Sequence, residues 1–326
     1  MMEIPAINSD HDHRSALLQP VGCLGRLEDV ANWIAKRQGK LLPDNLKPAI
    51  VIFAADHGVT SALTHPEAGP STAERVMHAV SEQSVIRKLA EEAGASLTIV
   101  DLGVKGELSG VEVDVVRESG SADIRVESAM SEAQYWEAVG IGEELAARAI
   151  SEGANLLTAS SLVSGDRVAV AALICELAGV APEEALEASS HKTYAEELMA
   201  VEVALDRAQG TSSHDILREV GGIELAAMAG FYRAAARKGV PVLLDGKASA
   251  AAALAAAAWD VRITGWMLAS FVSEDRAHIL ALEELGLEPL MHLQRSLSGA
   301  KGAALLMPLL QSSLALHRGF ATVEEF

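Results

Sequence analysis

The sequence predicts an α/β protein with a doubly wound, mostly parallel sheet of the Rossmann-like type. Short, continuous apolar runs such as PAIVIFA and VPVLL are typical of strands that are buried on both faces. These runs alternate with helical patterns of a dozen residues or more, as the βαβ units of a parallel sheet require. Half of the residues are apolar but only 4% are aromatic, so small aliphatic side chains must form the core where helices pack on the sheet.

The first half of the chain begins with an amphipathic helix. Apolar residues at helical spacing, among them Leu27, Val30 and Ile34, predict this helix over residues 23–38. The elements expected after it are a strand over 47–56, a helix over 72–93, a strand over 96–104, a shorter strand over 111–117, a helix over 131–152 and a strand over 155–160.

The second half continues the same alternation. The elements expected here are helices over 168–178 and from Pro182 to about Gln209, one helix or a pair over 216–239, a strand over 240–246, a helix over 248–258, a strand over 263–271, and helices over 276–286 and 303–317. We expect residues 46–302 to form an α/β ligand-binding domain. The chain ends, residues 1–45 and 303–326, are expected to form a small helical subdomain.

The charge of the chain limits its partners. With a formal net charge of −19 and a pI of about 4.9, the chain lacks the basic character that nucleic acid or an anionic membrane surface would need. A small anionic ligand could still be held by backbone N–H groups at the start of a helix. The sequence therefore favours small-molecule substrates, with no nucleic-acid and no membrane partner.

Cysteine content and the length of the apolar runs indicate a cytoplasmic protein. The two cysteines, Cys23 and Cys175, have no paired spacing, which favours a reducing compartment. The first residues are polar and acidic and contain no signal-peptide core. The Ala-rich run between Lys247 and Asp260 is too short and too weakly hydrophobic to span a bilayer.

Several common catalytic and metal-binding motifs do not occur in this sequence. There is no HExxH, paired CxxC, GxSxG or P-loop pattern, which argues against a serine hydrolase and against a structural zinc site. A metal hydrolase built on Asp56 and His57 would need further ligands at a recognisable spacing, and the sequence offers none.

Polar residues follow the predicted strands at the point where each one ends. They are Asp56 and His57, Asp101, Ser160 and Ser161, Asp245, and Ser270. In a parallel sheet the carboxyl ends of the strands lie at one edge, which is where α/β proteins bind their ligands. We therefore expect these side chains to surround a binding site.

Two of these strand ends also have a purely structural interpretation. Asp56 and His57 are either a substrate contact or acid/base pair, or parts of a turn in which Asp56 accepts backbone N–H bonds. Asp245 and Gly246 either contact ribose hydroxyls or form another turn.

The loop before the helix predicted at 168–178 could hold a phosphate. Its backbone N–H groups lie just before a helix start, and the guanidinium of Arg167 could add a charge-assisted bond. The carboxylate of Asp166 would oppose an anion unless it caps the helix. The residues selected from this loop are Ser161, Gly165, Asp166 and Arg167.

Two glycine-containing segments can be interpreted either as ligand-binding or as purely structural. Gly221 and Gly222 permit either the close approach of a ligand or a simple turn before the next helix. In the loop LSGAKGAA, Lys301 either approaches a phosphate or carboxylate or is a solvated surface residue.

The chain resembles a known family, the nicotinate-nucleotide–dimethylbenzimidazole phosphoribosyltransferases of cobamide lower-ligand synthesis. The resemblance covers nearly the whole chain, with the segments in the family's order. The segments that carry it are PVGCLGRLEDVANWIAKRQGK, AIVIFAADHGV, LAEEAGASLTIVDLGV, EVGGIELAAMAGFYRAAARKGVPVLLDGKASAAAAL, ILALEELGLEPLMHL and KGAALLMPLL.

The resemblance implies a reaction, its substrates and an assembly. Nicotinate mononucleotide would donate its phosphoribosyl group to 5,6-dimethylbenzimidazole or a related base or phenol, with an α-ribosyl-base phosphate and nicotinate as products. No metal and no organic cofactor is implied. The dimeric habit of the family implies a homodimer, or a heterodimer with a related chain.

The departures from the family pattern lie in the loops expected to face the ligand. The family's LGEGTGAA, whose Glu is its expected general base, is LSGAKGAA here, with Gly299 at the Glu position. The family's phosphate loop GEMGIGNTT corresponds to SSLVSGDRV, in which Gly165 is retained. Because glycine cannot accept a proton through a side chain, we consider Glu67, Glu74 and Glu82 as substitutes. The alternative is a catalytically impaired relative that acts as the partner subunit of an active copy, or as a nucleotide- or base-binding protein.

Overall fold

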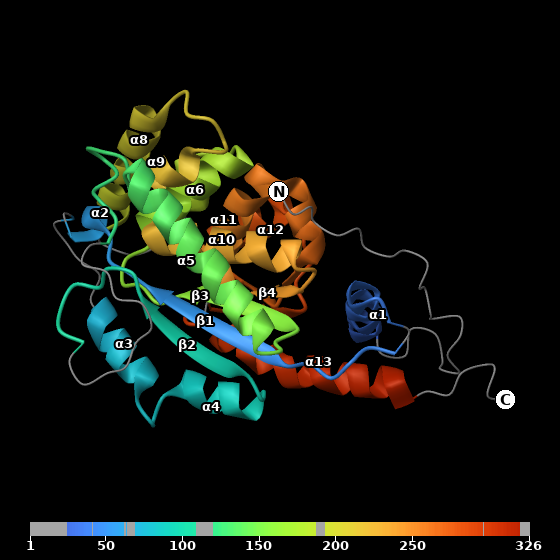
Figure 1. Ribbon diagram of the computed structural model, residues 1–326. Coiled ribbons are helices and arrows are strands. Elements are labelled where there is room, and N and C mark those ends of the chain that lie inside the picture. The colour runs from blue at the N-terminus through green and yellow to red at the C-terminus, as the bar shows by residue number, and fades with distance from the viewer. Residues whose placement is uncertain are drawn as a thin grey trace.

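Within the described residues, five parallel strands form a central sheet in the order β2-β1-β3-β4-β5 (Figure 1). A computed structural model describes residues 25–40, 42–61, 63, 69–108, 120–186, 193–295 and 297–319. The strands are β1 (Pro48–Ala54), β2 (Ser96–Asp101), β3 (Leu156–Ser161), β4 (Val242–Leu244) and β5 (Met267–Ala269). The predicted parallel α/β architecture is thereby confirmed.

Helices cover both faces of the sheet, and the residues of β1 alternate between the two faces. Val51 and Phe53 belong to one buried cluster with residues of α5 (Glu132–Ser151), α6 (Arg167–Ala178), α10 (Ile223–Arg237) and α11 (Gly246–Trp259). Ile50 and Ile52 belong to a second cluster with residues of α1 (Arg26–Gln38), α3 (Thr72–Val80), α4 (Val85–Glu92) and α13 (Lys301–Gly319). Figure 1 shows these two groups of helices on opposite sides of the sheet.

The remaining elements are short helices and a second, smaller sheet. Strands β6 (Phe271–Ser273) and β7 (Met291–Leu293) pair in parallel. The helices are α2 (Gly58–Ser61), α7 (Pro182–Ala185), α8 (Tyr194–Ala208), α9 (Ile216–Val220), the 3₁₀ helix η2 (Val261–Trp266) and α12 (Arg276–Glu284). Among the described helices, none is both long and apolar enough to cross a bilayer.

The order of the strands places a topological switch point between β1 and β3. From β1 the chain first adds β2 on one side, and the later strands are added on the other side of β1, beginning with β3. In sheets of this kind the crevice for a ligand opens beyond the carboxyl ends of the two strands at the switch point. The same edge carries the polar residues singled out in the sequence.

Two predicted elements are wrong in the structure. The single helix expected over 72–93 is interrupted between α3 and α4, because Ser81 is extended and Ser84 begins a new helix by accepting the N–H of Arg87. The strand expected over 263–271 begins instead as the 3₁₀ helix η2, and the extended part is divided by Ser270 into β5 and β6. No pattern in the sequence predicted β7, a strand of three residues with no buried side chain.

Two helical regions of the sequence are each divided in the structure. Residues 216–239, for which the sequence allowed one helix or a pair, form the pair α9 and α10, separated at Gly221 and Gly222. The described residues between Pro182 and Gln209 likewise include two helices, α7 and α8. The short strand expected over 111–117 lies outside the described residues.

Helices from the two chain ends lie together beside the sheet. Helix α1 packs on α13, and the Ser313 hydroxyl donates a 2.7 Å hydrogen bond to the Leu27 carbonyl oxygen. Both helices contribute to the same buried cluster as β1. The division of the chain into an α/β domain and a helical subdomain remains a prediction.

Candidate functional site

Two cavities adjoin at the carboxyl edge of the sheet, next to the switch point. The first, which we call the polar cavity, has a volume of about 200 Å³ and is lined by Ser160, Ser161, Asp245 and the loop that leads into α6. The second, the apolar cavity, has a volume of about 380 Å³ and includes Ile52 of β1 and Leu162 after β3. Arg75 and Ser298 line both cavities, so the two form one composite site.

The polar cavity brings together six of the residues selected from the sequence. These are Ser161, Gly165, Asp166, Arg167, Asp245 and Gly246. They come from β3, from the loop before α6 and from the start of α11, which are far apart in the sequence but end at the same edge. Polar residues that follow different strands therefore line this one cavity.

Two cations of the polar cavity, Arg167 and Lys247, are held by carboxylates. Arg167 Nε lies 3.0 Å from Glu197 Oε2 of α8, and Lys247 Nζ lies 3.1 Å from Asp275 Oδ2. These bonds fix the direction of both side chains and neutralise much of their charge. Asp166 occupies the N-cap position of α6 but makes no capping bond, so the first-turn N–H groups of α6 have no side-chain cap.

Gly165 is required by the backbone of the loop before α6. Its φ is +88°, and a Cβ added there would lie 2.2 Å from Thr60 Cγ2. The Thr60 hydroxyl also donates a hydrogen bond to the Gly165 carbonyl oxygen. A larger residue would be strained twice, by its backbone conformation and by contact with Thr60.

Asp245 organises the entrance to α13. Its carboxylate accepts hydrogen bonds of 2.8 Å from the Ser160 hydroxyl, 2.9 Å from Ala300 N–H and 2.8 Å from Ala303 N–H. Burial raises the pKa of this carboxyl, although these donors favour the charged form. The bonds hold Ala300 in a left-handed conformation with φ +63°, so Asp245 shapes the segment that carries Gly299 and Lys301.

The apolar cavity is walled by aliphatic side chains and has charged residues at its margin. Its apolar walls are Ile52, Pro70, Ala79, Val85, Ile86 and Leu162, and its polar residues are Glu74, Arg75, His78, Ser84, Ser298 and Lys301. Gly299, the position at which the resemblance led us to expect a glutamate, also lines this cavity. Its size and walls suit a planar aromatic molecule.

His57, just after β1, is buried and lines neither cavity. His57 Nε2 lies 3.0 Å from both carboxylate oxygens of Glu224, and both side chains are almost completely buried. Although burial lowers the pKa of His57, the charge and hydrogen bond of Glu224 outweigh it and raise that pKa. A Cβ at Gly222 would lie 2.7 Å from His57 Nε2, so glycine is needed there for this pair to form.

Other predicted residues also have structural partners. Asp56 accepts a 2.7 Å bond from the Thr72 hydroxyl and a 2.6 Å bond from Lys105 N–H, as the turn interpretation expects. The Ser270 hydroxyl is buried and donates a 2.5 Å bond to the Leu244 carbonyl oxygen. Asp56, Ser270, Gly221 and Gly222 line neither cavity.

The three glutamates considered as substitutes for a missing base differ in position. Glu74 lines the apolar cavity, but its carboxylate accepts the N–H and hydroxyl of Ser71 in a capping box, and the backbone bond from Ser71 lowers its pKa. Glu82 is exposed and lines neither cavity. Glu67 lies outside the described residues.

Sequence reasoning missed Arg75, His78 and Glu224. The first two lie on α3 and reach the apolar cavity, but no motif distinguishes them from solvated helix residues. Glu224 follows Gly221 and Gly222 at a helix start, a segment that the sequence singled out for its glycines and not for this acid. Its partner His57 is 167 positions away, which no local pattern indicates.

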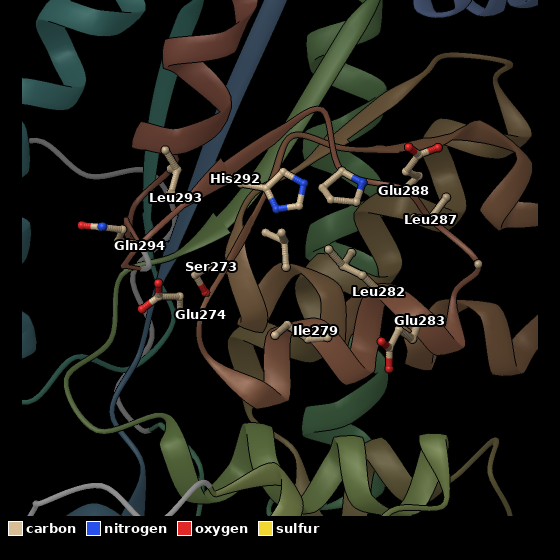
Figure 2. A pocket seen from close by; sticks show the side chains of 13 residues that line it. Ser273, Glu274, Ile279, Leu282, Glu283, Leu287, Glu288, His292, Leu293 and Gln294 are labelled. Atoms are coloured by element: carbon tan, nitrogen blue, oxygen red, sulfur yellow. The ribbon is translucent and has the colours of Figure 1, made fainter. Parts of the chain in front are cut away.

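A third cavity lies away from these residues. It has a volume of about 630 Å³, larger than the polar cavity and the apolar cavity, and is formed around β6, α12 and β7. Figure 2 shows Glu283 and Glu288 near it together with apolar residues such as Leu282 and Leu287. It contains none of the residues selected from the sequence.

The same geometry offers no cluster of metal ligands among the described residues. Nowhere in the described ranges do three or more His, Cys, Asp or Glu side chains come together as a metal site would need. His57, which the metal-hydrolase interpretation uses, instead binds Glu224 directly.

Comparison with known proteins gives a consistent result. A family model described as "Phosphoribosyltransferase" matches residues 5–326. The nicotinate-nucleotide–dimethylbenzimidazole phosphoribosyltransferase of Chromobacterium violaceum is 39% identical over 330 residues, covering 99% of this chain and 96% of that protein. The enzyme of the same name from Xanthomonas campestris pv. campestris strain B100 is 36% identical, with 95% and 90% covered.

A solved structure agrees with these sequence matches. The crystal structure of the nicotinate-nucleotide–dimethylbenzimidazole phosphoribosyltransferase of Thermus thermophilus superposes with a TM-score of 0.86 at 33% identity. The match covers 96% of this chain and 95% of that one.

Proposed function

Because the chain belongs to the nicotinate-nucleotide–dimethylbenzimidazole phosphoribosyltransferase family, we propose that it transfers the phosphoribosyl group of nicotinate mononucleotide to a lower-ligand base. The acceptor would be 5,6-dimethylbenzimidazole or a related base or phenol, and the product an α-ribosyl-base phosphate for cobamide synthesis. One observation carries this proposal: a polar and an apolar cavity adjoin at the switch point and share Arg75 and Ser298.

The polar cavity would hold the phosphate and ribose of the donor. The helix α6 offers first-turn N–H groups without a side-chain cap, and these groups together with the helix dipole favour an anion. Because Arg167 is already paired with Glu197, backbone N–H groups would supply the direct bonds to phosphate. Asp245 would act by holding the segment at 298–303 rather than by binding ribose.

The apolar cavity would hold the aromatic acceptor. Ile52, Ile86 and Leu162 supply flat apolar contacts to a ring, and their walls exclude water from the reacting atoms. The C1′ atom would then lie at the junction near Arg75 and Ser298. Bringing both reactants into fixed positions is itself a large part of the catalysis such a transfer needs.

The proposed activity can be tested with the homogeneous protein. Incubation with nicotinate mononucleotide and 5,6-dimethylbenzimidazole, or with a panel of benzimidazoles and phenols, should release nicotinate and form the matching ribosyl phosphate. Both products are measured by chromatography and mass spectrometry. Gly165→Ala should raise the KM for nicotinate mononucleotide, since it disturbs the loop before α6. No nicotinate release with any acceptor would contradict the proposal.

Gly299 favours a second candidate function. A chain without the expected glutamate could serve as the partner subunit of an active relative, or bind a nucleotide or base without turnover. In that case calorimetry would detect binding of nicotinate mononucleotide by this chain alone, while turnover would appear only after mixing with a relative that has the complete motif. Turnover by this chain alone would contradict the second candidate.

A further inference from the structure

Lys301 places an amino group beside the position where a side chain at residue 299 would begin. A Cβ built on Gly299 would lie 3.8 Å from Lys301 Nζ and 3.2 Å from Leu162 Cδ1. The amino group therefore borders the region that a glutamate at 299 would occupy. Lys301 also lines the apolar cavity, where the acceptor is expected under the proposed function.

A hydrogen bond of the side chain and hydrogen bonds of the neighbouring backbone hold this amino group in position. Lys301 Nζ donates a 2.6 Å hydrogen bond to the Ser298 carbonyl oxygen. Its backbone belongs to the segment that Asp245 holds through Ala300 and Ala303. Among the described residues Lys301 has no carboxylate within ion-pair distance, unlike Lys247 and Arg167 in the polar cavity.

The charged groups around Lys301 come from two elements. Helix α3 contributes Glu74, Arg75 and His78, and the end of β4 contributes Asp245. Burial lowers the pKa of Lys301, Asp245 raises it and Arg75 lowers it, and the net effect is a pKa below the ordinary 10.5. Partial burial and a neighbouring cation are recognised ways to keep a larger share of a lysine amine neutral, and so able to accept a proton.

We propose that Lys301, rather than a carboxylate, is the general base of this site, a role that rests on the proposed phosphoribosyl transfer. The lone pair of the acceptor nitrogen or oxygen forms a bond to C1′ of the nucleotide. The bond from C1′ to the nicotinate nitrogen breaks, and its electron pair leaves with nicotinate. The proton of the acceptor N–H or O–H moves to the neutral Nζ of Lys301, which becomes an ammonium group.

The competing bases in the cavity are less suited to this role. The carboxylate of Glu74 is committed to the capping box with Ser71 at the start of α3. His78 lies on the exposed side of α3, at the margin of the cavity, and is the rival to be distinguished by experiment. Gly299 has no side chain to offer.

The test compares the pH dependence of nicotinate release for matched variants. For the unaltered protein kcat/KM should rise with pH to a plateau, with a midpoint below 10.5 and above the ordinary range of carboxylates, about 4.3 for glutamate. Lys301→Met should lower the plateau by about 100-fold or more and abolish this rise. Lys88→Met removes an exposed lysine of α4 and should leave the profile as it was.

A double variant tests whether amine and carboxylate are interchangeable. Gly299→Glu with Lys301→Thr introduces the family's residues at both positions, and the rise in kcat/KM should move to acidic pH. Binding of nicotinate mononucleotide and the thermal unfolding midpoint are measured for every variant, so that loss of the base is separated from loss of the fold.

A second readout does not depend on turnover. Competitive acylation of lysines in the folded protein at a series of pH values, analysed by mass spectrometry, should show that Lys301 becomes reactive at lower pH than Lys88. If Lys301 and Lys88 titrate together, the base role is overturned.

The outcomes separate the base role from the activity itself. If kcat/KM still rises with pH in Lys301→Met, the role of Lys301 is overturned but the transfer reaction is not. The same conclusion follows if the rise is lost in His78→Gln and retained in Lys301→Met. No nicotinate release with any acceptor would overturn both.

Discussion

The end of β1 and the end of β4 start from the same sequence pattern, an apolar strand followed by an acid, but the structure uses them differently. After β1, His57 is bound to Glu224 in a buried pair that lines neither cavity. After β4, Asp245 lines the polar cavity and accepts three hydrogen bonds, two of them from the backbone at the start of α13. The first pair joins β1 to α10, whereas Asp245 joins the sheet to the segment that carries Gly299 and Lys301.

This difference shows that a polar residue at a strand end can act in two ways. A buried pair that lines neither cavity contributes to the stability of the fold. A buried acid that positions the segment bordering a cavity can also influence the reaction, without itself touching the reacting atoms. Substitutions should therefore separate stability from activity at these two places.

The largest expected effect is on stability, at the end of β1. Glu224→Ala leaves His57 buried without its partner and should lower the free energy of unfolding by about 3–5 kcal/mol in urea titration. Replacing both residues with apolar side chains, in His57→Leu with Glu224→Met, should recover much of this loss. A double variant as unstable as the single one would contradict the pairwise origin of the effect.

The same pair predicts a pH dependence of stability. Because the pKa of His57 is raised in the folded protein, its contribution is fully present below about pH 6.5, the ordinary value for histidine. It is lost as the pH rises through the folded-state pKa. Urea titrations across this range should show a decline in stability that is missing in the apolar double variant.

An intermediate effect is expected at the end of β4, where stability and activity should both change. In Asp245→Asn an amide NH₂ would face one of the N–H or hydroxyl donors, which should cost about 1–3 kcal/mol of unfolding free energy. The loosened segment at 298–303 should also reduce nicotinate release. Ser313→Ala is a matched control, since it removes one partly buried hydrogen bond of α13 at a residue that lines neither cavity, and it should affect stability alone.

The smallest effect is expected at Glu82. This glutamate is exposed at the break between α3 and α4 and lines neither cavity. Glu82→Gln should change the free energy of unfolding by less than about 0.5 kcal/mol and leave nicotinate release unaltered. A large loss of activity would show that this carboxylate reaches the reaction and would weaken the case for Lys301.

Much of the fold could be predicted because its signals are local. The buried strands β1 and β4 lie in continuous apolar runs, and such a run can be recognised from a few neighbouring residues. The break between α3 and α4 and the strand β7 could not be predicted in the same way. At Ser81 to Ser84 a cap overrides the helical periodicity, and β7 is too short and too exposed to show a pattern.

The sequence alone determined that the strands run parallel with helices between them, that polar residues follow the strands, and that residue 299 carries no acid. Only the tertiary structure decided which of those polar residues line a cavity and which are paired with another buried side chain. The physical reason is that the pKa and the availability of a side chain depend on burial and on neighbours from distant segments. Glu224 beside His57, and Lys301 beside Gly299 and the walls from β1, β3 and α3, become neighbours only when the sheet and its helices pack.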